Sequence, residues 1–385
     1  MGDDKMTDRD GCIALNMISG IGYIRFTALS EYFGGAGNAA CRSVEEYLRV
    51  NGINAAVAEK LASSDMQKMC DYEKILAERS GVRIITICDP DYPQVLKELY
   101  DPPVCLYVRG RLPAFPGRSI AVVGSRRMSR YGEMMTHAIT NDAAAAGYVI
   151  VSGLAYGVDT IAHRTTVECG GTTVAVLGGG LQHVHPRENI PLARDIINSG
   201  GAVISEFPMD HPVSRTSFPR RNRIIAGLTC ATLVVEAGVK SGALISAQVA
   251  VELGRDVFAV PGQATNEQAK GCHKLIREGA GLTESFDDIY NHLTGGVQMG
   301  LFPENSMLHD AAESTPYIPA PPEDLSPDLA EVYQYISGSG VSMEELAGYT
   351  GMDTAQLAAL LMRLEFKFLI RRGADMLYYP AGGKA

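Results

Sequence analysis

The stretch AVVGSRRMSRYG, residues 121–132, joins a short apolar run to the start of an amphipathic segment. Gly124, Ser125 and Arg126 follow the apolar residues directly. This order is typical of a buried strand that turns into a helix, whose first N–H groups and positive dipole end favour an anion. Glycine lets the backbone approach a ligand, serine can donate a hydrogen bond, and arginine can hold a phosphate with two. The stretch predicts an anion-binding turn at the end of a strand.

The same pattern recurs across residues 118–290. Short apolar runs, rich in β-branched residues and mostly ending in glycine, alternate with amphipathic or Ala-rich stretches. These runs cover residues 119–124, 148–153, 173–178, 202–206, 231–237 and 256–262. The alternation predicts an α/β fold, with a Rossmann-like, doubly wound parallel sheet covered by helices on both faces. Such sheets bind ligands at the carboxyl ends of their strands.

Three further glycine loops follow strand-like runs, within residues 151–163, 176–189 and 236–250. The residues that they add at strand ends are Ser152, Gly153, Arg187, Lys240 and Ser241. Because parallel strands end at one edge of a sheet, these loops predict a crevice for a ligand with several phosphates. None of them has the spacing G-x-G-x-x-G, so a dinucleotide ligand has little support.

The stretch FPRRNRIIAG, residues 218–227, places Arg220, Arg221 and Arg223 close to Phe218. No Asp or Glu occurs between Asp210 and Glu236. A row of phosphates requires a row of positive charges, and an aromatic ring gives a base a face on which to stack. The stretch therefore fits single-stranded nucleic acid. Asn222 would hold the loop or contact the ligand, and core packing of Phe218 remains an equal alternative.

Three sets of polar residues could indicate catalysis or metal binding. Asp159 and His163 are four residues apart on a predicted helix, where a surface or capping pair is expected rather than an acid–base pair. His183 and His185 lack a third ligand at a suitable spacing, so no metal is expected. Glu236 is the main carboxylate at a strand end and has no evident His or Lys partner.

Composition limits the class of protein. The chain has 385 residues, a net charge of −10 and 46% hydrophobic residues, so an ordinary globular protein of two or three domains is expected. The eight cysteines are scattered without a C-x-x-C pair, which suits reduced thiols in the cytoplasm. No long apolar run or signal peptide is evident, so no membrane association is expected. The acidic total argues against general polyanion binding, yet it permits a local basic groove.

The flanks predict smaller domains. Residues 7–80 read as helices with tight glycine turns, either a paired helix-hairpin-helix unit or a plain helical cap. Residues 294–327 are rich in Pro, Gly and Ser and predict a linker. Residues 328–380 predict three helices and a hairpin, which is the pattern of a winged helix. The expected division is 1–80 helical, 81–293 Rossmann-like, 294–327 linker and 328–385 winged helix.

These motifs together resemble the DNA-processing protein A family, also called DprA or Smf. The matching stretches are DPDYPQVLKELYDPPVCLYVRG, GSRRMSRYG, SGLAYGVDTIAH, GTTVAVLGGGL, SEFP, FPRRNRIIAGL, VVEAGVKSGALISAQVA, DVFAVPG and GCHKLIREGA, between residues 89 and 290. The ends match in type, with a SAM-like or helix-hairpin-helix N-terminus and a winged-helix C-terminus. One departure is LQHVHP, where the family more often has Asp after Leu and Tyr before Pro, and it puts the fine shape of the groove in doubt.

The resemblance implies a homodimer, formed through the Rossmann-like domain, that binds single-stranded DNA without catalysis or cofactor. It implies protection of incoming strands in natural transformation and loading of RecA recombinase, beside single-strand-binding protein on the same DNA. The residues carried over by position are Ser125, Arg126, Arg187, Arg215, Phe218, Arg221, Asn222, Arg223, Lys240 and Ser241. Gly124, Ser152 and Gly153 are expected in the same crevice.

Two other classes of function compete with this one. A Rossmann-type enzyme acting on a nucleotide or nucleoside phosphate would need a polar catalytic pair in the crevice. A protein-binding scaffold is favoured by the acidic total and the winged helix.

Two short segments carry separate predictions. In the winged helix, Leu357, Leu360, Leu361, Leu364 and Phe368 recur at helical spacing and should face its core. In the linker, Gln298–Phe302 (QMGLF) resembles the peptide by which bacterial DNA-processing proteins dock on the sliding clamp. The alternative for that peptide is that Met299, Leu301 and Phe302 pin the linker to the domain surface.

Overall fold

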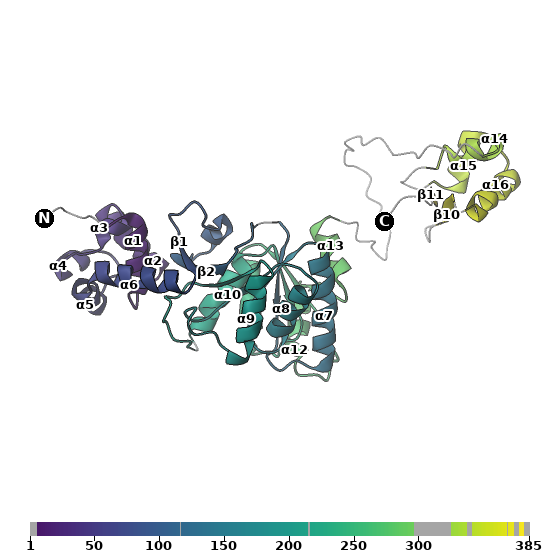
Figure 1. The fold of residues 1–385 in the computed structure, drawn as a ribbon. Coiled ribbons are helices and arrows are strands. Elements are labelled where there is room, and N and C mark those ends of the chain that lie inside the picture. The colour runs from purple at the N-terminus through teal and green to yellow at the C-terminus, as the bar shows by residue number, and fades with distance from the viewer. Residues whose placement is uncertain are drawn as a thin grey trace. The chain divides into compact units, whose positions relative to one another are not determined.

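The computed structural model describes residues 6–115, 117–214, 216–295, 325–336, 341–367, 369–372 and 377–380. The chain divides into two compact units, Met1–Met299 and Gly300–Ala385. In Figure 1 the colour runs from purple through teal and green along the first unit and ends in yellow in the second. The predicted linker falls mostly between the described ranges, and the peptide Gln298–Phe302 lies outside them.

The first unit contains a mixed sheet, which within the described residues has nine strands in the order β1-β2-β6-β5-β4-β3-β7-β8-β9. The strands are β1 (Val82–Thr86), β2 (Cys105–Gly110), β3 (Ser119–Val123), β4 (Val149–Ser152), β5 (Thr173–Val176), β6 (Ala202–Ser205), β7 (Ala231–Val234), β8 (Asp256–Ala259) and β9 (Gly281–Leu282). From β6 to β9 all neighbours pair in parallel, whereas β2 pairs antiparallel with both β6 and β1. The six predicted strands are confirmed, and β1, β2 and β9 are additions to them.

Strand order decides where a ligand can enter. The chain builds β3, β4, β5 and β6 in one direction, and then returns to place β7 on the other side of β3. The connections that follow β3 and β7 therefore diverge to opposite faces of the sheet. A crevice opens at the carboxyl ends of two such strands.

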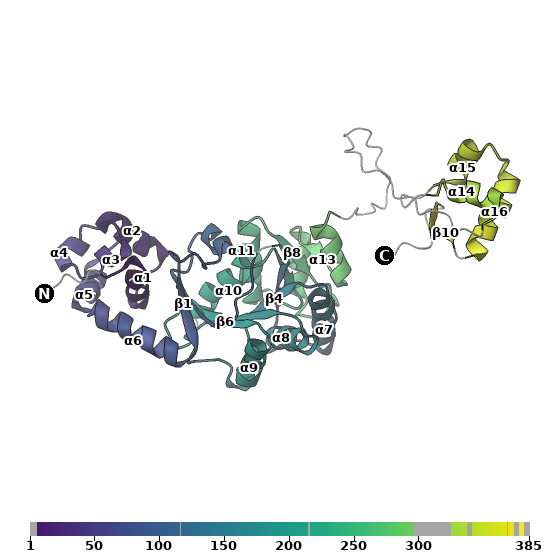
Figure 2. The same cartoon turned by 45° about the horizontal axis from the view of Figure 1, so that its top comes forward.

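Helices cover both faces of the sheet, as Figure 2 shows from a second direction. They are α7 (Arg130–Ala145), α8 (Val158–Glu168), α9 (Ile190–Asn198), α10 (Ser217–Gly227), α11 (Ala243–Glu252), α12 (Lys270–Arg277) and α13 (Phe286–Leu293). Along β3, Ile120 and Val122 join a core cluster with α7, α8 and α13, whereas Ala121 and Val123 join one with α10 and α11. Burial on both faces explains why the strands read as continuous apolar runs.

The N-terminal helices pack on the antiparallel edge of this sheet. They are α1 (Asp8–Met17), α2 (Tyr23–Phe33), α3 (Ala36–Ala39), α4 (Val44–Tyr47), α5 (Ala55–Ser63) and α6 (Met66–Arg79). One cluster joins Ile13 and Leu61 from the helices to Tyr107 of β2 and Ile196 of α9. The helical prediction for this segment agrees with the structure, and its standing as a separate domain stays a prediction.

The second unit has a core of its own. It contains α14 (Pro327–Tyr333), α15 (Met343–Thr350), α16 (Thr354–Phe366) and the antiparallel pair β10 (Ile370–Arg372) and β11 (Tyr378–Pro380). Leu357, Leu361 and Leu364 are buried in it and Leu360 packs against it, which confirms the predicted face of α16. Phe368 lies outside the described residues.

Among the described residues, no helix combines the length and the apolar character that crossing a membrane requires.

Candidate nucleic-acid interface

A cavity of about 460 Å³ lies at the strand-order reversal. Its walls are the loop after β3, the loop after β7 and one side of α10. The structure brings together eight of the predicted site residues here, namely Gly124, Ser125, Arg126, Phe218, Arg221, Asn222, Lys240 and Ser241. Motifs that are far apart in sequence thus meet at the edge where the fold predicts a ligand.

The turn after β3 is fixed by its neighbours. Ser125 is buried, and its Oγ accepts a hydrogen bond from the Arg127 N–H at 3.1 Å. Gly157 has φ +77°, and a Cβ there would lie 2.2 Å from the Ser125 carbonyl oxygen. A Cβ on Gly124 would lie 2.6 Å from Val158. Close packing against the start of α8 therefore requires these glycines and presents Arg126 to the cavity.

The first turn of α7 is already occupied by a carboxylate. Glu236 is buried, and its two oxygens accept from the Ser129 N–H at 2.7 Å and the Ser129 hydroxyl at 2.6 Å. The Ser129 Oγ in turn accepts from the Gly132 N–H. The prediction of a free helix N-terminus after this strand is therefore wrong, because a carboxylate from the end of β7 fills it. Glu236 supports the helix.

Arg126 and Phe218 form the exposed wall of the cavity. The Arg126 guanidinium carbon lies 4.7 Å from the Phe218 ring centroid. Phe218 is half-buried, and a Cβ on Gly178 would lie 3.1 Å from its ring. The ring is thus packed against the loop after β5 and also borders the cavity. Both alternatives for this residue, core packing and a place beside the ligand, agree with this position. Lys240 is exposed on the opposite loop.

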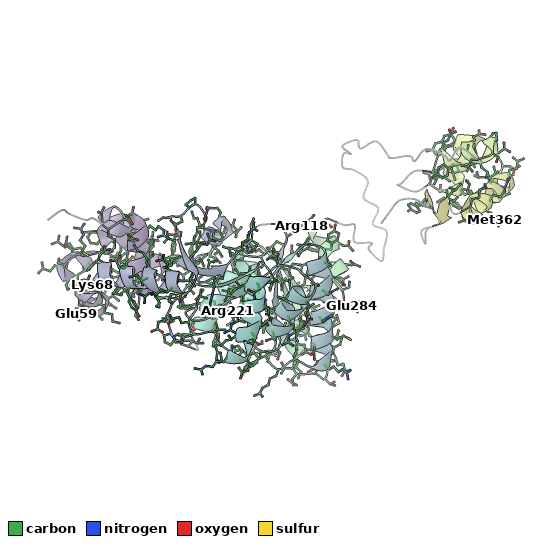
Figure 3. The ribbon with its side chains drawn as sticks, in the orientation of Figure 1. Glu59, Lys68, Arg118, Arg221, Glu284 and Met362 are labelled. Atoms are coloured by element: carbon green, nitrogen blue, oxygen red, sulfur yellow. The ribbon has the colours of Figure 1, made fainter. Side chains whose placement is uncertain are left out.

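Arg221 is buried beneath the cavity. It comes from α10 in the α/β part of the chain and is labelled in Figure 3. Its Nη1 donates to the carbonyl oxygens of Gly153 and Val176, and its Nε donates to Asn222 Oδ1. A Cβ on Gly153 would lie only 1.8 Å from Nη1. The guanidinium thus joins three elements, and it presents its charge from below the cavity floor.

Asp159 lies near this buried charge. It is buried at the start of α8 and accepts from the N–H groups of Gly153 at 3.1 Å and Ala155 at 3.3 Å. Burial raises the pKa of Asp159, and the positive charge of Arg221 is the strongest opposing influence. The only carboxylate that lines the first cavity among the described residues is therefore engaged in structure.

Arg220 and Arg223 point elsewhere. Both guanidinium groups contact the buried carboxylate of Glu206, at 3.1 and 2.5 Å, and Arg223 lies 3.6 Å from Asp101. The structure does not bring Arg223 to the cavity, so the expectation that it lines the same pocket is wrong. The acids that neutralise these two arginines, Glu206 and Asp101, both lie outside the acid-free stretch between Asp210 and Glu236. Asn222 Nδ2 donates to the Gly242 carbonyl at 3.1 Å and ties α10 to the loop before α11.

The remaining predicted residues are dispersed. Ser152 is buried and donates to the Val122 carbonyl at 2.7 Å, so it supports the sheet. Gly153 lines a small pocket of about 20 Å³ next to the first cavity, and Arg187 lines a separate cavity of about 700 Å³. Arg215 lies outside the described residues.

The two candidate catalytic or metal pairs resolve differently. Asp159 and His163 are both buried, so neither is a surface residue, while the capping alternative agrees with Asp159, which accepts from two backbone N–H groups just before α8. His163 Nδ1 contacts Thr173 Oγ1 at 2.7 Å, and burial lowers its pKa to about 3, so the ring is neutral. His183 Nε2 contacts Asp210 at 2.8 Å. In the described part of the chain no three His, Cys, Asp or Glu side chains gather as metal ligands would.

Some lining residues were not singled out from the sequence. Tyr156 is exposed beside the small pocket and donates to Glu188 at 2.7 Å. Arg109 of β2 and Arg194 of α9 line the larger cavity. Neither arginine belongs to a glycine loop, and only the antiparallel addition of β2 beside β6 brings Arg109 to this part of the fold.

The pairing of Arg223 with Glu206 leads to a prediction. Arg223→Ala should change affinity for a single-stranded oligonucleotide by less than about threefold, because its charge is neutralised away from the cavity. It should also lower the free energy of unfolding by about 1–3 kcal/mol, since Glu206 loses a partner. Fluorescence anisotropy and urea unfolding measure the two effects. A tenfold loss of affinity in the folded variant would return Arg223 to the binding surface.

The chain matches known protein families over most of its length. The family model described as DNA recombination-mediator protein A matches residues 83–294, and the DprA winged helix domain matches residues 316–376. Protein Smf of Escherichia coli is 38% identical over 83% of this chain and 82% of that protein. Protein Smf of Synechocystis is 31% identical over 95% of this chain and 97% of that protein.

A solved structure agrees with these matches. The crystal structure of DNA processing protein A from Streptococcus pneumoniae is 33% identical, with a TM-score of 0.62 over 74% of this chain and 98% of that chain. The first family model covers more than half of the chain and contains the whole cavity at the strand-order reversal. This chain therefore belongs to the DprA/Smf family of DNA recombination-mediator proteins.

Proposed function

We propose that this chain binds single-stranded DNA, without catalysis, at the carboxyl edge of its sheet. One observation carries the proposal. At the strand-order reversal, exposed Arg126 and Lys240 line a cavity together with Phe218, while Asp159, the lining carboxylate described there, is engaged in structure. Phosphates would lie on the cations, and a base would stack on the ring or on the guanidinium that covers it. Such stacking contributes about 1–3 kcal/mol per base and does not depend on sequence.

A nucleotide-processing enzyme fits the same cavity less well. It would need a free acid or base in reach of the ligand. Glu236 is hydrogen-bonded at the first turn of α7, and His163 is buried away from the cavity against Thr173. The polar groups described at this edge of the sheet therefore support binding.

Recombination mediation extends this proposal. We infer that the bound strand is handed to RecA recombinase, beside single-strand-binding protein, by a homodimer formed through the Rossmann-like part, as in natural transformation. Membership of the recombination-mediator family supports the inference. A strand-exchange assay with RecA and single-strand-binding protein tests it. We expect the chain to shorten the lag caused by single-strand-binding protein, and no effect at any ratio would contradict the inference.

The second unit should contribute little affinity for duplex DNA. Its α16 carries exposed Arg363, and exposed Lys367 follows the helix, but Asp353 and Glu365 balance these two charges. A helix that reads a groove normally offers a net positive charge. We expect an isolated fragment of residues 325–385 to bind duplex DNA negligibly at physiological salt, and we infer a protein-docking or regulatory role. Anisotropy with a labelled duplex tests this, and tight binding would overturn it.

The peptide Gln298–Phe302 remains a proposed sliding-clamp contact. Leu301 and Phe302 would fill an apolar pocket, so micromolar affinity at best is expected after the cost of ordering the segment. A labelled peptide of residues 294–306 is titrated into purified clamp, beside a control with Leu301→Ala and Phe302→Ala. Equal weak binding of both peptides would leave only the packing alternative.

A further inference from the structure

The cavity of about 700 Å³ that contains Arg187 begins at the carboxyl edge of the sheet and runs along α9 toward the amino end of β6, where Arg109 pairs with Val203. Its walls come from the loop after β5, from α9, from β2 and from the residues that join α6 to β1. The pocket of about 20 Å³ shares Arg126 and Phe218 with the first cavity, and it shares His183, His185 and Val213 with this second one. The three hollows are therefore neighbours between the loop after β7 and α9. The place of α9 beside β6 is visible in Figure 2.

Three exposed arginines from three different elements line the second cavity. Arg109 comes from β2, Arg187 from the short helix η2 (Arg187–Asn189) and Arg194 from α9. The described residues that line it include no carboxylate, and the arginine–carboxylate pairs in the described ranges are made by other arginines. In a chain of net charge −10, three guanidinium groups without a described acid partner favour a polyanion at this place.

The floor of this cavity is apolar. Leu181, Val184, Ile197, Val203 and Met209 line it beneath the arginines. A free phosphate would use the charges but not the floor, and an aliphatic ligand would use the floor but not the charges. A nucleotide unit uses both, because its phosphate is anionic and its base offers a flat apolar face.

We propose that this cavity is a second nucleotide subsite, in which Arg109 and Arg194 hold the DNA strand after it leaves Arg126 and Phe218. The inference rests on the proposed function and adds to it the path of the DNA strand and the length of strand that is bound. The strand passes from the loops after β3 and β7, across His183 and His185, to α9. Oligomers long enough to cover both cavities should then bind through more phosphates than short ones.

The test uses the full chain and two oligo(dT) probes, one of about four and one of about sixteen nucleotides, the range of site sizes known for single-strand-binding OB folds. The variant is Arg109→Ala with Arg194→Ala. Affinity for the long probe should fall roughly tenfold, and its salt slope should shrink by about 1.4, which is 0.7 for each lost contact on single strands. Affinity for the short probe should stay within about twofold of the wild type, because that probe fits the first cavity alone.

The control is Arg118→Ala with Arg164→Ala, which removes the same charge from two exposed arginines that line neither cavity. It should leave both probes bound as in the wild type. If the wild type and the Arg109/Arg194 variant bind the long probe equally, or if the control weakens it as much, the subsite is overturned. If the wild type binds neither probe, the proposed function fails and the subsite fails with it. A thermal midpoint for each variant verifies folding.

Discussion

Arg221→Ala should lower the free energy of unfolding by about 3–5 kcal/mol, the usual cost of breaking a buried charged interaction from one side. The Arg221 guanidinium is buried and holds the carbonyls of Gly153 and Val176. Its removal leaves both oxygens without this donor and leaves Asp159 without its nearby positive charge. Urea unfolding followed by circular dichroism measures the change. Arg164→Ala, at an exposed position on α8, is the control and should shift stability by less than about 0.5 kcal/mol.

The loss at Arg221 should also depend on pH. Burial raises the pKa of Asp159 above its unfolded value, so its favourable contribution is present below about pH 3.9 and is lost as pH rises through the folded pKa. Without Arg221 the folded pKa of Asp159 rises further. The destabilisation by Arg221→Ala should therefore grow between about pH 4 and pH 7. Adding Asp159→Asn should recover part of it at neutral pH, and a pH-independent loss with no recovery would contradict the coupling.

Arg126→Ala should weaken binding of every single-stranded oligonucleotide, roughly tenfold to a hundredfold, as expected for loss of a charge-assisted contact of about 1.5–3 kcal/mol. The residue is exposed at the cavity wall, and its guanidinium covers Phe218. The salt slope should shrink by about 0.7 on single strands. Fluorescence anisotropy at several salt concentrations measures both quantities.

The exposed position of Arg126 makes this second prediction separable from folding. Its substitution should leave the unfolding midpoint nearly unchanged, in contrast to Arg221→Ala. Arg164→Ala removes the same charge outside the cavities and should keep both affinity and slope. A folded Arg126 variant with wild-type affinity and slope would remove this residue from the binding surface.

The sequence predicted the six strands β3 to β8 because they are buried on both faces and read as apolar runs. The short parallel strand β9 is more exposed and gave no such run. The antiparallel strands β1 and β2 were not separated from their loops, since β2 is placed by pairing with β6 and β1 by pairing with β2. The glycine loops predicted which strand ends meet, because parallel strands share one edge.

Whether each charged side chain is buried, exposed or paired could not be predicted in the same way. Arg221 and Arg223 are two residues apart, yet one is buried under the cavity and the other pairs with Glu206. Gly153 is 68 residues from Arg221 and Glu206 is 17 residues from Arg223, so no pattern within the helix distinguishes the two arginines. In the sequence, Glu236 likewise has no evident partner. In the structure it accepts a hydrogen bond from the Ser129 N–H at the start of α7.

A single DNA strand is expected to lie in the cavities that begin at the carboxyl edge of the sheet, held through its phosphates. The most direct measurement is a salt titration of the full chain with a labelled oligo(dT), in competition with unlabelled thymidine monophosphate. We expect tight binding that weakens steeply with salt, and no displacement by the mononucleotide at concentrations that match the oligomer in phosphate. Affinity that is flat with salt, together with full displacement by the mononucleotide, would contradict this expectation and would indicate a site for a single nucleotide.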